Sequence, residues 1–169
     1  DREFQRLASE VGLRAPPRLL VSRLPRGPVS GGILRPTVVL PAAFAQLPQA
    51  ELRSLLAHEL VHLRRRDPLA ALVQWAAVAL WWWNPVVWLA SCAVTRERER
   101  CCDTEVLGTL RLDPQAYAQS LIDVLRERMV ARPRAVPLTM PLTSPVGRRL
   151  EYIMRGTRFV ARPPKRNLI

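Results

Sequence analysis

The two histidines of this 169-residue chain lie four residues apart, in the segment LLAHELVHLRRRDPL at positions 55–69. On an α-helix, positions i and i+4 share one face, so His58 and His62 can direct their imidazoles at one point. Glu59 lies beside them, where it can take a proton from a water molecule. In this HExxH arrangement two neutral imidazoles bind Zn²⁺ and the glutamate serves as the base in peptide-bond hydrolysis. The spacing predicts His58 and His62 as zinc ligands and Glu59 as the catalytic base.

The alternative is a solvated or core helix that carries two incidental histidines. Because histidine is so rare in this chain, its occurrence twice at the one productive spacing argues against chance. Four neighbouring leucines would embed the helix: Leu55, Leu56, Leu60 and Leu63. We therefore expect a zinc-binding helix over residues 48–66.

A catalytic zinc usually keeps three protein ligands and one open position. Because the chain has no third histidine, the third ligand must be a carboxylate or a thiolate. The segment TRERERCCDTEVL (95–107) places Glu99 and Asp103 on one helical face. We expect Glu99 to bind the metal and Asp103 to hydrogen-bond a ligating histidine and fix its tautomer. Cys102, one turn from Glu99, is the competing ligand. Glu97 fits a solvated, salt-bridged face.

Residues 69–94, LAALVQWAAVALWWWNPVVWLASCAV, carry no charge, and an uncharged run of this length predicts membrane insertion. A buried core helix is the alternative, but a small soluble domain would struggle to cover it. Asn84-Pro85 breaks the run, and tryptophans cluster at the break as in an interfacial aromatic belt. A helix over residues 68–83 would rise roughly 24 Å, and a helix over residues 86–99 would return roughly 21 Å. The chain would then bring Glu99 back to the level of the histidines. We expect a membrane-inserted helical hairpin over residues 68–99.

The charge balance is strongly basic, with 26 Lys+Arg against 14 Asp+Glu and a net charge of +12. Such a surface suits nucleic acid, anionic lipid or an acidic protein. Neither a reading-helix motif nor aromatics interleaved with basic residues occur, so no direct nucleic-acid binding is expected. Arginines lie just before and just after the apolar run, and a hairpin would place both groups on the same side of the membrane. Because positive charge is typical of the cytoplasmic side, we expect that side to face the cytoplasm. Three cysteines without a CxxC pair agree with a reducing compartment.

The first third of the chain is punctuated by Pro and Gly, and 19–22 and 37–40 predict short strands of an antiparallel sheet. Pro36 and Pro41 bound the second strand and predict that it lies at an edge. Helix starts are predicted at three further pairs: Asp67-Pro68, Asp113-Pro114 and Ser144-Pro145.

We expect one α+β domain over residues 1–169, mainly helical with a small sheet. Because the chain begins at Asp1, we expect it to be part of a longer membrane protein. Its expected parts are an N-terminal helix and small sheet over 1–47, the HExxH helix over 48–66, the apolar hairpin over 68–99, and C-terminal helices with a tail over 100–169.

In order, these segments resemble one family, the membrane-bound zinc metallopeptidases of the BlaR/MecR antirepressor type. The resemblance covers about residues 13–156. Its main segments are HELVHLRRRDPL (58–69), WNPVVW (83–88) and RERERCCDTEVL (96–107), joined by GGILRPTVVLP (31–41), YAQSLIDVL (117–125) and GRRLEYIM (147–154). Cys101 departs from the family, where a small residue such as alanine is expected.

The resemblance implies a gluzincin-like fold with zinc ligands His58, His62 and Glu99, base Glu59 and supporting Asp103. It implies an integral membrane protein whose active site faces the cytoplasm. Its substrate would be a protein or peptide, such as a transcriptional repressor in a signal-transduction pathway that regulates antibiotic resistance.

Substrate contacts are expected on the predicted edge strand, where an extended peptide would pair with Thr37, Val38 and Val39. Asn84 either caps the helix turn or contacts substrate. Two other functions compete with regulatory proteolysis. One is a housekeeping membrane protease of the CAAX-processing or heat-shock type, which also uses HExxH and ExxxD. The other is a non-catalytic sensor domain in which the zinc is structural.

Overall fold

Helix α2 (Gln49–Arg64), which carries the HExxH sequence, lies at the centre of the fold. Its residues from Ser54 to Val61 are all buried, so the helix is covered on every side rather than on one face. The sheet and α1 pack on one side of it, and α4 and α5 pack on the other. This burial is consistent with the predicted leucine-embedded helix.

The computed structural model describes residues 2–23, 27–130 and 145–160. The chain is mostly helical with a small sheet, which agrees with the predicted α+β class. The remaining elements are α1 (Arg2–Glu10), β1 (Arg18–Ser22), β2 (Val29–Gly31), β3 (Thr37–Pro41), the 3₁₀ helix η1 (Ala42–Gln46), α3 (Asp67–Leu80), α4 (Pro85–Leu110), α5 (Pro114–Val130) and α6 (Pro145–Val160).

The sheet differs from the prediction in two ways. It is mixed, in the order β1-β3-β2, with β1 parallel and β2 antiparallel to β3. The prediction that 37–40 is an edge strand is therefore wrong, because β3 is the central strand. Pro36 precedes β3 and Pro41 ends it, so neither proline removes an N–H from the interior of the strand. Strand β2 was not predicted, since three residues are too short to show alternation.

Helices α3 and α4 form the predicted hairpin, and it projects from the body of the molecule. The break falls at Asn84-Pro85, where the Asn84 side chain accepts a hydrogen bond from the backbone N–H of Val86 at 2.9 Å. Gln74 joins the two helices by donating to the Ser91 carbonyl oxygen at 2.9 Å and to Thr95 Oγ1 at 2.9 Å. The capping role of Asn84 is thus confirmed.

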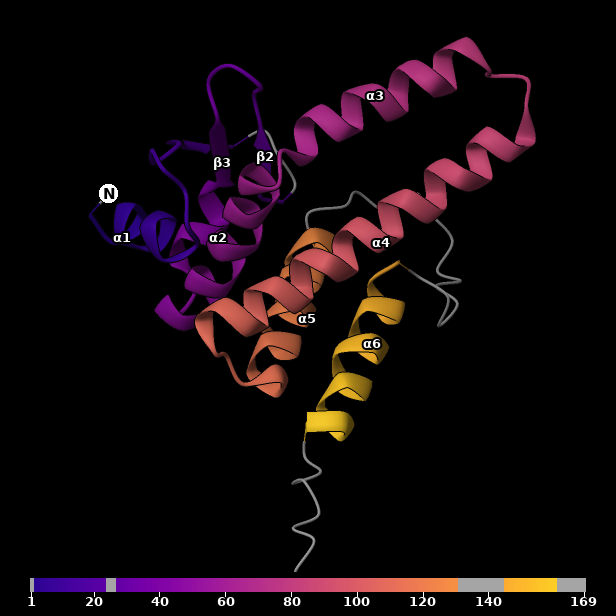
Figure 1. The fold of residues 1–169 in the computed structure, drawn as a ribbon. Coiled ribbons are helices and arrows are strands. Elements are labelled where there is room, and N and C mark those ends of the chain that lie inside the picture. Colours follow the sequence, from indigo (N-terminus) through magenta and orange to yellow (C-terminus); the bar gives the residue numbers. More distant parts are fainter. Residues whose placement is uncertain (1, 24–26, 131–144, 161–169) are drawn as a thin grey trace, which may run out of the picture.

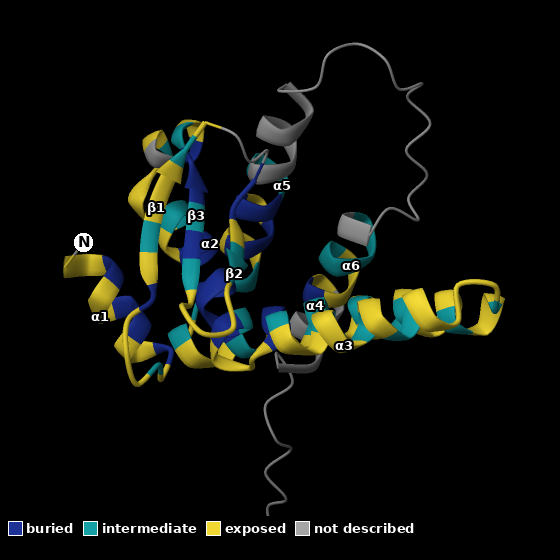
Figure 2. Cartoon of the chain, turned by 90° about the horizontal axis from the view of Figure 1, so that it is seen from above, coloured by how far each residue is buried: buried dark blue, intermediate teal, exposed yellow. Residues whose placement is uncertain are grey.

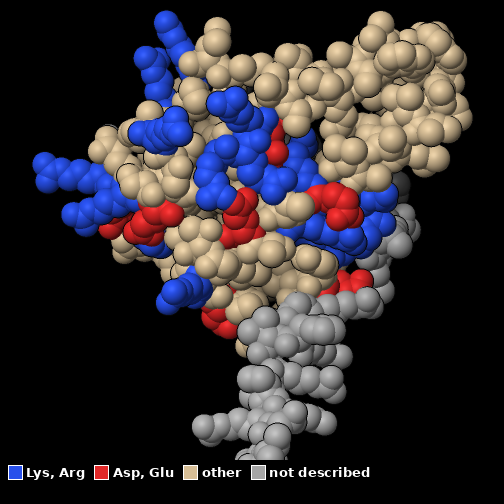
Figure 3. All heavy atoms as spheres, viewed as in Figure 1, with Lys and Arg blue, Asp and Glu red and all other residues tan. Residues whose placement is uncertain are grey.

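The hairpin exposes its apolar side chains. Figure 3 shows no charged atoms towards its tip, and charge begins where the hairpin meets the body. The exposed residues include Leu72, Val73, Trp75, Leu80, Trp81, Trp82, Trp83, Val86, Trp88 and Leu89. Within the described ranges, no helix combines the length and the apolar character needed to cross a membrane.

The predicted helix starts are mostly found. Asp113 caps α5 by accepting a hydrogen bond from the Ala116 N–H at 3.0 Å. Asp67 is not a cap, because Arg66, in the left-handed conformation with φ 59°, occupies that position and Asp67 is the first residue of α3. The Asp67 side chain instead contacts His62 of α2. Ser144 lies outside the described residues, as do residues 161–169 at the end of the segment for which C-terminal helices and a tail are predicted.

Candidate metal centre

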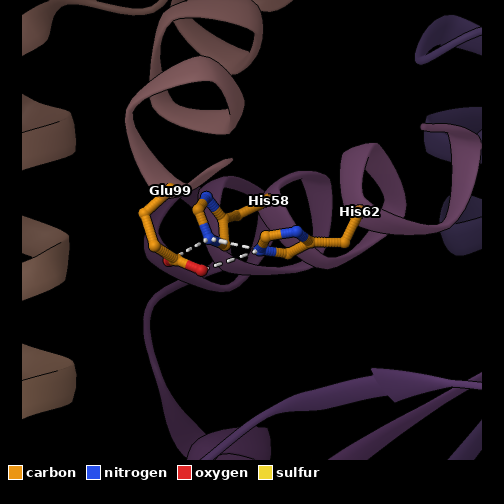
Figure 4. Close-up of side chains that lie close together, drawn as sticks. All are labelled: His58, His62 and Glu99. Carbon is orange, nitrogen blue, oxygen red and sulfur yellow. Dashed lines mark hydrogen bonds and ion pairs between the residues drawn. The ribbon is translucent and has the colours of Figure 1, made fainter. Parts of the chain in front are cut away.

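His58, His62 and Glu99 converge, as Figure 4 shows. The two Nε2 atoms lie 3.1 Å apart. The Glu99 carboxylate faces both, with Oε2 at 3.5 Å from His58 Nε2 and Oε1 at 3.6 Å from His62 Nε2. The sequence-predicted ligand set is therefore brought together by two elements that lie far apart in the chain.

The hairpin positions Glu99. Helix α3 leaves the end of α2 and α4 returns alongside it, so that the second half of α4 packs on α2. Glu97, two residues earlier, points elsewhere: its side chain is 62% exposed and accepts a hydrogen bond from Arg100 at 2.6 Å. This matches the predicted solvated role of Glu97.

The donor set fits a zinc ion. Zn–N and Zn–O bonds of about 2.0–2.2 Å in tetrahedral geometry place neighbouring donors roughly 3.3 Å apart. The observed separations of 3.1, 3.5 and 3.6 Å fall close to that value. Two imidazole nitrogens with a carboxylate are also a common ligand set of catalytic zinc.

Asp67 orients His62. Its Oδ2 lies 2.7 Å from His62 Nδ1, and both side chains are mostly buried. The carboxylate can only accept, so His62 carries its proton on Nδ1 and leaves the Nε2 lone pair facing His58 and Glu99. The sequence indicated Asp67 only as a helix start and not as a partner of His62. Its position before a proline, immediately after the HExxH helix, was the signal that could have indicated this contact.

Asp103 and Tyr117 adjoin His58 on the other side. His58 Nδ1 lies 3.1 Å from the Tyr117 hydroxyl and 3.3 Å from Asp103 Oδ1. Tyr117 donates its hydroxyl proton to Asp103 at 2.8 Å. The predicted placement of Asp103 beside a ligating histidine agrees with this geometry. Tyr117, which α5 supplies, was not predicted, because no pattern marks it apart from an ordinary core tyrosine.

Arg149 of α6 also reaches the site and was not predicted. Its Nε and Nη2 donate to the two oxygens of Asp103 at 2.9 and 2.7 Å. Its Nη1 lies 3.1 Å from Glu99 Oε2. The sequence offered no means to select this arginine among so many.

The electrostatics of the cluster favour a cation. Burial lowers the pKa of His58, but hydrogen bonds with Asp103 and Glu99 outweigh it and raise that pKa to about 9. Burial raises the pKa of Glu99, yet its hydrogen bond with His58 and the charges of His58 and Arg149 lower it to about 2. In the metal-free protein a proton on His58 thus provides the positive charge that the surrounding carboxylates stabilise.

Cys102 lies on the opposite side of His62 from Glu99. Its Sγ is 3.2 Å from Nδ1 of His62 and 3.4 Å from Asp67 Oδ2. Burial and the neighbouring Asp67 carboxylate raise the pKa of the thiol far above its ordinary value. Cys102 therefore groups with His62 and Asp67 on the Nδ1 side of the ring, whereas Glu99 groups with the Nε2 atoms of both histidines.

The remaining predicted residues lie in three places. Glu59 is buried on α2, next to His58. Residues 37–39 pair with β1 on one side and β2 on the other, so their backbone offers no free edge to a peptide. Asn84 lies at the tip of the hairpin, away from the histidines. The structure therefore does not bring Thr37, Val38, Val39 or Asn84 into the cluster.

Comparison with known proteins adds two findings. A family model described as BlaR1 peptidase M56 matches residues 1–153. Over 95 residues the chain is 34% identical to the regulatory protein BlaR1 of Bacillus licheniformis, a match that covers 55% of this chain and 16% of that protein. The chain thus corresponds to a small part of that relative's length.

Proposed function

The chain belongs to the BlaR1 peptidase M56 family, a family of metallopeptidases, and we propose that it is a zinc endopeptidase. In this proposal His58, His62 and Glu99 bind the metal and Glu59 is the general base. The observation that carries it is the convergence of two Nε2 atoms and one carboxylate at the spacing that zinc needs.

Each neighbouring side chain has a defined task in this mechanism. Bound zinc would lower the pKa of a water molecule and polarise the substrate carbonyl. Glu59 takes the proton of the attacking water and delivers it to the leaving amine. Asp67 holds the His62 tautomer, and Asp103 with Tyr117 holds that of His58.

We further propose that the α3–α4 hairpin inserts into the cell membrane as part of a gluzincin-like domain whose active site faces the cytoplasm. Its exposed tryptophans and leucines support insertion, because water-exposed apolar surface of this extent favours transfer into lipid. Arginines at its base support the cytoplasmic orientation: Arg64, Arg65, Arg66, Arg96, Arg98 and Arg100.

The substrate class that we propose is a protein, cleaved in a signalling pathway, such as a transcriptional repressor. The similarity to a protein named for regulation supports this. The alternative of housekeeping proteolysis would be supported instead by cleavage of prenylated peptides or misfolded membrane proteins.

The decisive test of catalysis is Glu59→Gln, with Glu97→Gln as the matched surface control. Each detergent-purified protein is assayed for zinc content and for cleavage of fluorescein-labelled casein, with and without a chelator. We expect Glu59→Gln to keep its zinc and to lose at least about 100-fold in rate, since it removes proton transfer. A Glu59→Gln protein that cleaves as fast as the wild type would refute the mechanism.

A further inference from the structure

Helix α6 is anchored so that Arg149 reaches the donor set. Leu150 packs against the core, and Ile153, one turn from Arg149, is buried. The guanidinium of Arg100 lies 5.4 Å from the ring centre of Tyr152, which ties α6 to α4. The position of Arg149 is therefore set by packing and not by its charge alone.

One edge of the Arg149 guanidinium is fixed, and the rest of it faces the proposed ligands. Nε and Nη2 form the bidentate pair with Asp103. Nη1 lies 3.1 Å from Glu99 Oε2, and Nη2 lies 3.4 Å from His58 Nε2, the ring nitrogen that faces the metal position. Only 16% of the side chain is exposed. The group is thus a fixed, largely desolvated cation at the edge of the metal position.

The charges of the site call for such a cation. Three carboxylates adjoin the two histidines, those of Asp67, Asp103 and Glu99, and the ionised base Glu59 adds a fourth beside His58, whereas zinc brings two positive charges. A substrate oxygen that becomes negative there would meet a site with no surplus positive charge. Arginine stays protonated in proteins, and a buried, pre-oriented cation stabilises an anion far more than one in water.

We propose that Arg149 stabilises the oxyanion that forms on the scissile carbonyl, and that Asp103 holds its guanidinium in position for this task. The inference rests on the proposed function and names a catalytic residue for it. The water oxygen adds to the carbonyl carbon, the π-electron pair moves to the carbonyl oxygen, and Glu59 takes the water proton. N–H groups of Nη1 and Nη2 donate to that oxygen. As the C–N bond breaks, the electron pair returns to the carbonyl and Glu59 protonates the amine.

The experiment compares Arg149→Ala and Arg149→Lys with the neighbouring control Arg148→Ala. The probe is an N-phosphorylated dipeptide, whose tetrahedral anion resembles the oxyanion. Its dissociation constant is measured calorimetrically on the zinc-loaded full chain in detergent, and zinc affinity is measured by chelator competition. For Arg149→Ala we expect probe binding about 100-fold weaker. Zinc affinity should fall by less than about tenfold, the smallest loss expected of a residue that orients a ligand.

Arg149→Lys should bind the probe more tightly than Arg149→Ala and less tightly than the wild type, because lysine keeps the positive charge but lacks the paired N–H donors of the guanidinium. Unchanged probe binding in Arg149→Ala, or no probe binding by the wild type, would overturn the inference. A loss of zinc affinity well beyond tenfold would also overturn it and assign Arg149 to positioning His58. Failure of the proposed function is separate: it shows as a wild-type chain without stoichiometric zinc, or as full activity in Glu59→Gln.

Discussion

Replacing Asp67 by asparagine is expected to weaken zinc binding by about 10–100-fold, or about 1.4–2.7 kcal/mol. The substitution keeps the shape of the side chain and removes its charge. The 2.7 Å contact with His62 Nδ1 is a short, largely buried, charge-assisted hydrogen bond, so its loss lowers the basicity of Nε2 and loosens the ring. An asparagine could also present its amide N–H groups and lose the tautomer control altogether.

The assay is the zinc dissociation constant from competition with a chelator, at one fixed pH. The matched control is Asp113→Asn, because Asp113 also precedes a proline at a helix start but caps exposed backbone. Asp113→Asn should keep the cap of α5, because an asparagine oxygen can accept the same hydrogen bond, and should leave zinc affinity unchanged. If Asp67→Asn bound zinc as tightly as the wild type, the reasoning about His62 would be refuted.

Three further outcomes are expected. Zinc affinity, measured by chelator competition, should rise tenfold per pH unit up to about pH 9 and then level off. The reason is the raised pKa of His58, because below that value a proton competes with the metal for the imidazole. A flat profile from pH 6 to 8 would contradict this. Tyr117→Phe should lower the unfolding free energy by about 1 kcal/mol in urea titrations, because it deletes the hydroxyl that bridges His58 and Asp103, and unchanged stability would show that this bridge adds nothing. Replacing Trp82 and Trp83 by serine should reduce co-sedimentation with anionic lipid vesicles, whereas undiminished binding would count against hairpin insertion.

The proposed metal ligands could be predicted because local rules connect them. The i, i+4 spacing places two histidines on one helical face, and the part of α4 that precedes Glu99 is about as long as α3, so the hairpin returns Glu99 to its starting level. The break at Asn84-Pro85 gave the point of return. Each of these inferences needs only sequence spacing and helix geometry.

The surroundings of the ligands could not be predicted, because they depend on tertiary packing. Tyr117 and Arg149 arrive from α5 and α6, and no sequence spacing relates those helices to α2. Asp67 contacts His62 where the chain turns from α2 into α3 through Arg66 in a left-handed conformation, a local geometry that the residue spacing does not specify. The parallel pairing of β1 with β3 likewise depends on how the chain crosses over, which strand propensity does not encode.

The most direct test of the zinc centre is metal content in Glu99→Ala beside Glu97→Ala, with the wild type as reference. The two glutamates are two residues apart on α4, but one faces both histidines and the other is solvated. We predict one zinc per chain in the wild type and in Glu97→Ala, and a much weaker retention in Glu99→Ala. Equal zinc in all three proteins would contradict the proposed ligand set and make Cys102 the next residue to replace.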